Sequence, residues 1–77
     1  MERDLVEYIA KSLVDDPAAV SVAVVEGDKS TILELRVAAE DIGKVIGKHG
    51  RIAKAMRTIL SASLGASDKR FVLEILD

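Results

Sequence analysis

The sequence predicts a small α+β domain with the element order helix-strand-strand-helix-helix-strand. Apolar residues recur at helical spacing near the N-terminus and again over residues 38–64. Two runs rich in β-branched and alternating apolar residues flank a short polar turn, and a further apolar run lies near the C-terminus. The chain has 77 residues, so we place one domain over residues 1–77, with three strands on one side and three helices on the other.

The first half of the chain should form one helix and a β-hairpin. A helix is expected over residues 2–14, and Pro17 follows its end, because the residue before a proline is disfavoured in the α region. Strands are expected over residues 20–26 and 31–37, joined by the turn at 27–30. One face of the second strand carries the apolar residues Leu33, Leu35 and Val37.

The second half should form two helices, over residues 38–46 and 51–64, and a strand over 71–76. Gly65 is expected to end the longer helix. Its buried side is expected to carry Ile52, Met56, Ile59 and Leu60. The two aromatic residues, Tyr8 and Phe71, are expected in the core.

The positive charge of this chain is concentrated in one segment. The formal net charge is −2, yet residues 43–57 hold five basic residues and no acidic one: Lys44, Lys48, Arg51, Lys54 and Arg57. The rest of the chain has 6 basic and 13 acidic residues, a net charge of −7. Because the local field steers a polyanion more than the total does, this segment is a candidate contact for nucleic acid. A solvated basic face of no specific function would give the same pattern.

The turn Gly47-Lys48-His49-Gly50 between the two later helices carries the most specific signal. Glycine is needed where φ is positive or where another backbone approaches closely. The turn leads into a helix N-terminus, where the amides and the dipole favour an anion. Lys48 and Arg51 have the wrong sign for that dipole, which indicates an anionic partner at the same place. Ile46 and Ile52 flank the turn and offer apolar surface to bases.

The segment Val45-Ile46-Gly47-Lys48-His49-Gly50-Arg51-Ile52 resembles the KH-domain signature of an apolar pair, G-x-x-G and an apolar residue. With the element order, the chain is most similar to the small bacterial proteins that consist of one stand-alone type II KH domain, the KhpA type. That resemblance implies binding of single-stranded RNA, with about four nucleotides clamped by the loop. The implied RNA-contact residues are Lys44, Ile46, Gly47, Lys48, His49, Gly50, Arg51, Ile52 and Lys54.

The resemblance also implies roles and partners beyond the loop. It implies an RNA chaperone or post-transcriptional regulator, a homodimer, and a second KH-domain protein as partner. Residues 65–68 would be the short variable loop of the fold. A small domain with few aromatic residues to fill its core also favours self-association, with an interface away from Lys48 and Arg51.

Other functions fit the sequence less well. The chain has one histidine and no cysteine, so we expect no metal or other cofactor and no catalysis. Residues 43–50 lack the spacing of a nucleotide-binding P-loop. A DNA-binding helix-turn-helix would be expected to present Asn or Gln on its second helix, and the chain has neither residue.

A protein-interaction module with the KH shape and weak RNA binding remains the main alternative. Without cysteines, a signal peptide or a long apolar run, the sequence favours a cytoplasmic protein away from membranes.

Overall fold

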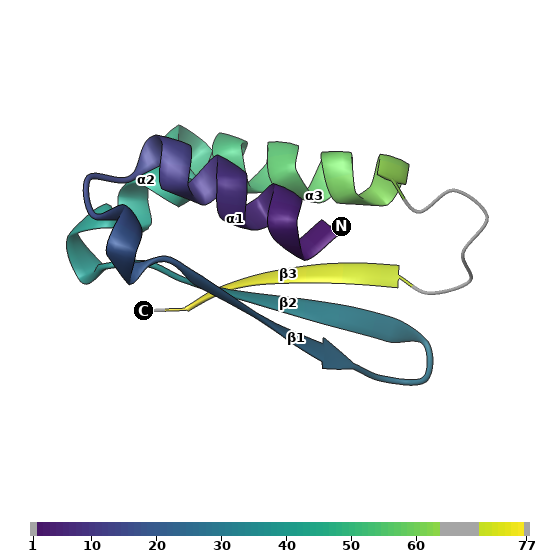
Figure 1. The fold of residues 1–77 in the computed structure, drawn as a ribbon. Coiled ribbons are helices and arrows are strands. Elements are labelled where there is room, and N and C mark those ends of the chain that lie inside the picture. The colour runs from purple at the N-terminus through teal and green to yellow at the C-terminus, as the bar shows by residue number, and fades with distance from the viewer. Residues whose placement is uncertain (1, 64–69, 77) are drawn as a thin grey trace.

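The computed structural model describes residues 2–63 and 70–76 and confirms the predicted order of helices and strands (Figure 1). Its elements are α1 (Glu2–Leu13), β1 (Ser21–Glu26), β2 (Ser30–Arg36), α2 (Ile42–Ile46), α3 (Arg51–Ser63) and β3 (Arg70–Leu76). Three short 3₁₀ helices, at Pro17–Ala19, Ala39–Asp41 and Lys48–Gly50, precede β1, α2 and α3. The α+β architecture is that of a type II KH domain. The expected helix stop at Gly65 and the expected variable loop at 65–68 lie outside the described residues.

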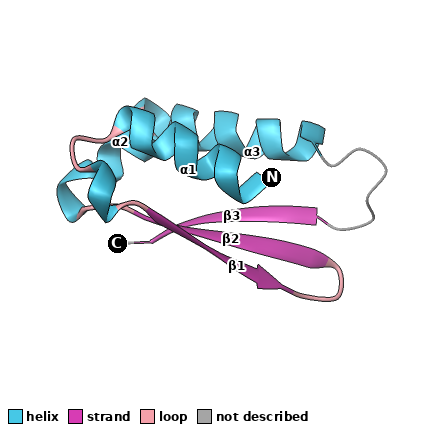
Figure 2. Cartoon of the chain, viewed as in Figure 1, coloured by secondary structure: helices cyan, strands magenta, loops and turns pink. Residues whose placement is uncertain are grey.

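The three strands form one mixed sheet in the order β1-β2-β3, and the helices lie together on one of its faces (Figure 2). β1 pairs with β2 in antiparallel orientation, as expected of a hairpin, and β2 pairs with β3 in parallel. The register aligns Leu33 with Val24 on one side and with Leu73 on the other. Parallel neighbours need a long crossover, which the segment containing α2 and α3 supplies.

The core lies between the helices and the inner face of the sheet. Leu33 and Leu35 on β2 are almost completely buried, as their alternation with polar residues predicts. The helices contribute Val6 and Ala10 from α1, Val45 from α2, and Met56 and Leu60 from α3. Within residues 2–63 and 70–76, we find no helix with the length and apolar character needed to cross a membrane.

Two side chains expected inside the core lie at the surface. Tyr8 is 72% exposed, because α1 packs through Val6 and Ala10, and Tyr8 lies about 200° around the helix axis from Val6. Ile59 is 44% exposed, since α3 packs through a narrow face. That face consists of Ala53, Met56 and Leu60. Phe71, by contrast, packs partly buried against the core, as predicted.

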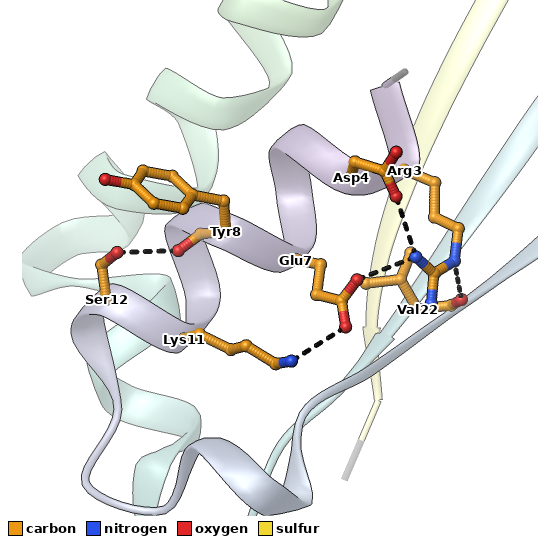
Figure 3. A network of polar contacts seen from close by, with 7 residues as sticks. All are labelled: Arg3, Asp4, Glu7, Tyr8, Lys11, Ser12 and Val22. Carbon is orange, nitrogen blue, oxygen red and sulfur yellow. Dashed lines mark hydrogen bonds and ion pairs between the residues drawn. The ribbon is translucent and has the colours of Figure 1, made fainter.

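Arg3 fixes the first helix to the edge of the sheet (Figure 3). Its Nε donates to the carbonyl oxygen of Val22 on β1 at 3.0 Å, and its Nη1 donates to Glu7 at 2.8 Å and Asp4 at 3.1 Å. The other carboxylate oxygen of Glu7 lies 3.1 Å from Lys11 Nζ. These two cations, first Lys11 and then Arg3, hold the pKa of Glu7 below its usual value. A side chain of α1 therefore occupies one backbone acceptor of the edge strand β1.

Candidate nucleic-acid interface

Gly47 forms the first corner of the loop in a backbone conformation that strongly favours glycine. Its amide donates to the carbonyl of Gly43 at 2.9 Å and closes α2. Its φ of 78° and ψ of 170° lie in a region that is essentially restricted to glycine. A Cβ placed here would lie 2.6 Å from Cγ1 and 2.9 Å from Cβ of Ile52. The glycine thus lets the loop backbone pack directly against the first turn of α3.

The second half of the loop turns through two left-handed residues. His49 has φ 59° and ψ 24°, and Gly50 has φ 73°. The amide of Gly50 donates to the carbonyl of Gly47 at 3.0 Å, and that of Arg51 donates to Lys48. These two amides are satisfied inside the turn, so they are not free to hold a phosphate.

Four side chains that can carry positive charge emerge from this turn into solvent. Lys48 and His49 lie in the loop, and Arg51 and Lys54 lie in the first turn of α3; all four are exposed. In the part of the chain that the structure describes, none of the four side chains has a hydrogen-bond or ion-pair partner. We call these four side chains the cationic cluster, and their exposure leaves them accessible to an anion.

Apolar and small side chains accompany these cations. Ile46 is 36% exposed at the end of α2, and Ile52 is partly buried beneath the loop. A shallow depression of about 420 Å³ also runs along the outer face of α3. It is lined by Arg51, Lys54, Ala55, Thr58 and Ile59. The end of this depression at Arg51 and Lys54 offers contact area beside charge, which a ligand with both a backbone phosphate and a base could use.

Lys44 lies outside this cluster. Its Nζ is 3.1 Å from Asp15 Oδ2 and 3.2 Å from Asp41 Oδ1. Hydrogen bonds to these two carboxylates, first Asp15 and then Asp41, raise the pKa of Lys44. The ammonium group of Lys44 thus already has two anionic partners, and the structure gives it a role in packing α2 against the segment that follows α1.

Comparisons with known proteins show the family to which this chain belongs. A family model described as KhpA/KhpB, KH domain, matches residues 3–75. This chain belongs to the KhpA/KhpB family of KH domains. It is 60% identical over 77 residues to a protein of Treponema pallidum named RNA-binding protein KhpA, covering all of this chain and 96% of that relative. A protein of the same name from Borreliella burgdorferi is 55% identical over 76 residues, covering 99% of this chain and 93% of the relative. No solved structure gives a significant match to the chain.

Asp41 has a role in this KhpA/KhpB-family domain that sequence reasoning missed. The segment predicted as one helix over 38–46 begins as a 3₁₀ turn, and its α-helix spans only Ile42–Ile46. Asp41 is buried, and its Oδ2 accepts a hydrogen bond from the amide of Asp16 at 3.0 Å. Burial by itself raises the pKa of Asp41, but the hydrogen bonds from Asp16 and Lys44 outweigh it and hold that pKa below its usual value. The spacing of Asp41 and Lys44, three residues apart, was the available signal.

Arg57 is also directed away from the cationic cluster. Its Nη2 donates to the carbonyl oxygen of Leu73 on β3 at 3.2 Å. The sequence placed Arg57 in one basic series with Arg51 and Lys54, but the structure gives it a backbone partner across the domain. Elsewhere among the described residues, no group of three or more His, Asp or Glu side chains is arranged to hold a metal ion.

Proposed function

We propose that this chain binds single-stranded RNA through the Gly47–Gly50 loop and the first turn of α3. The observation that carries the proposal is a tight glycine-bounded turn beside four unpartnered side chains, Lys48, His49, Arg51 and Lys54. Proteins of the same family are named RNA-binding proteins, which supports this ligand. The proposed contacts are the cations to phosphates and the two isoleucines, Ile46 and Ile52, to bases.

The proposed role is binding without catalysis. We place it in the cytoplasm, as an RNA chaperone or post-transcriptional regulator. The principal alternative is a KH-shaped protein-interaction module with weak RNA binding. Lys44, which we predicted as an RNA contact, would act in this proposal mainly by holding α2 in place, because Asp15 and Asp41 already neutralise it.

The proposal predicts a preference for single-stranded RNA over duplex DNA of equal length. The loop is a clamp for one flexible backbone, since a KH domain grips about four nucleotides of a single strand. Competition binding measured by fluorescence anisotropy should show that unlabelled RNA displaces a labelled single-stranded RNA more effectively than the DNA duplex does. Equal or tighter binding of the duplex would point to a helix-turn-helix and contradict the proposed ligand.

We also propose that the protein forms a symmetric homodimer whose interface leaves both loops open. Tyr8 on α1 and Ile59 on α3 are large exposed apolar side chains in the helical layer, and Ile59 lies two turns beyond Arg51. Two grooves on one RNA would raise avidity through effective concentration. The same surface would suit a second KH-domain protein as an alternative partner.

Self-association is therefore expected to depend on Ile59. Sedimentation equilibrium should give a mass approaching twice 8.3 kDa at high concentration for the wild-type chain. The variant Ile59→Glu should shift the equilibrium to the monomer, because it places a charge in an apolar contact. The control variant Val72→Glu also replaces an exposed apolar side chain with a charge, but on the sheet, and this variant should still form the dimer. A mass near 8.3 kDa at all concentrations for the wild type would exclude the dimer.

A further inference from the structure

The sheet face opposite the helices carries a continuous apolar row. Leu33, Leu35 and Leu73 face the helices, so the residues that alternate with them point to the other side. The register aligns Val25 with Ile32 and Ile32 with Val72, one residue from each strand. Val25 is 46% exposed and Val72 is 37% exposed. Three neighbouring β-branched side chains thus form an apolar strip across the whole sheet.

Two glutamates lie side by side next to that strip. Glu34 on β2 aligns with Glu74 on β3, and Ala23 on β1 completes their row. Neighbouring strands are about 4.8 Å apart, so the two carboxylates repel each other. Within residues 2–63 and 70–76, neither glutamate has an ion-pair or hydrogen-bond partner. Arg70 aligns with Ser30 and Arg36 aligns with Leu76, on the rows at the two ends of this face.

The edges of the sheet are less suited to a partner than this face. At the β1 edge, the carbonyl of Val22 already accepts a hydrogen bond from Arg3, and at the β3 edge the carbonyl of Leu73 accepts one from Arg57. Both contacts come from helices of the same chain. A strand added at either edge would have to displace an arginine, whereas a partner on the open face would displace only water.

We propose that the face formed by Val25, Ile32, Val72, Glu34 and Glu74 docks a basic segment of another protein. Aliphatic side chains of that segment would cover the strip, and its Lys or Arg residues would pair with the two glutamates. RNA does not fit this face, because its phosphates would meet two carboxylates. The face lies on the side of the sheet away from the helical layer that carries the loop (Figure 1), so RNA and this partner bind together. The inference does not depend on the proposed RNA function.

A designed peptide pair tests the charge and the location together. The probe is the capped peptide Val-Lys-Val-Lys-Val-Lys-Val, and its counterpart has Glu in place of Lys. In methyl NMR spectra of the full chain, the lysine peptide should shift the signals of Val25, Ile32 and Val72 in a saturable way. The core methyl groups of Val6 should stay in place, and the glutamate peptide should produce no shifts. Single-stranded RNA alone should leave the signals of Val25, Ile32 and Val72 in place, because the proposed RNA contacts lie on the other side of the sheet.

Matched variants separate this face from general attraction to an acidic protein. The double variant Glu34→Gln, Glu74→Gln should bind the lysine peptide about two- to tenfold more weakly, the range expected for the loss of two surface ion pairs. The control pair Glu2→Gln and Glu40→Gln removes the same charge elsewhere and should have no effect. Val25→Thr with Val72→Thr keeps the β-propensity, so the sheet should stay intact while the peptide no longer binds.

Four outcomes would overturn the proposal. The first is an absence of binding, and the second is equal binding of the two peptides. The third is that RNA alone shifts the methyl groups of Val25, Ile32 and Val72, which would make this face an RNA surface. The fourth is that the same signals move with protein concentration alone, which would mean that a second copy of this chain covers the face.

Discussion

Replacing both Lys48 and His49 with Asp is expected to weaken RNA binding about 100-fold or more, on the basis of two lost charge-assisted hydrogen bonds. The change also places two carboxylates where the proposal puts phosphates. Both side chains are exposed and without partners in the described structure, so the fold should survive. Fluorescence anisotropy would measure the affinity, and far-UV circular dichroism would check the helices and strands.

A matched control compares two single variants, Lys48→Asp in the loop and Lys29→Asp away from it. Both make the same change of charge, but Lys29 lies in the β1–β2 turn, at the other end of the molecule from the loop (Figure 1). The wild type should show a salt slope of roughly −2 to −3 if three or four phosphates of a single strand are neutralised. Lys48→Asp should flatten that slope, and Lys29→Asp should not. If the folded variant with Lys48→Asp and His49→Asp bound RNA as tightly as the wild type, the loop would not be the RNA-contact surface.

The second large effect is expected on stability. Gly47→Ala should lower the free energy of unfolding by about 2–5 kcal/mol, from backbone strain and overpacking together. Strain arises because Gly47 has φ 78° and ψ 170°, and overpacking arises because the new Cβ would meet Ile52 at 2.6 Å. In a domain of this size, such a loss is a large part of the total stability. Urea denaturation followed by circular dichroism would measure it.

The other glycines of this segment give graded controls. At Gly50, φ is 73°, but no atom lies within 4 Å of the position that a Cβ would take. Gly50→Ala should therefore lower the free energy of unfolding by about 1–3 kcal/mol, from backbone strain alone. Gly43 lies in α2 without a positive φ, and no atom lies within 4 Å of the position that a Cβ would take. Gly43→Ala should therefore raise the free energy of unfolding by about 0.5–1 kcal/mol.

The clash itself can be tested by a double-mutant cycle. Ile52→Ala removes the atoms that the new Cβ of Gly47→Ala would meet, so the two losses should sum to more than the loss in the double variant. If Gly47→Ala proved as stable as Gly43→Ala, the loop would not have the conformation described here.

Local sequence patterns determined the element order and the place of the loop. Helix and strand periodicities act over a few residues, and the turn chemistry of Gly47 and Gly50 is set by their own backbone angles. The strand expected over residues 31–37 and the helix expected over 2–14 therefore lie within about one residue of their observed limits, a difference usual for element ends.

Only the tertiary structure decided which charges are free and which side chains are covered. Lys44 and Lys48 look alike in the sequence, but folding brings the distant Asp15 to Lys44, beside its neighbour Asp41, and leaves Lys48 in solvent. Arg57 continues the basic series of α3, yet the position of β3 gives it the carbonyl of Leu73. Ion pairs and burial depend on segments that are distant in sequence, whereas helical periodicity reports only which residues share a face. For the same reason, the adjacent glutamates on the open sheet face became visible only when the strand register aligned them.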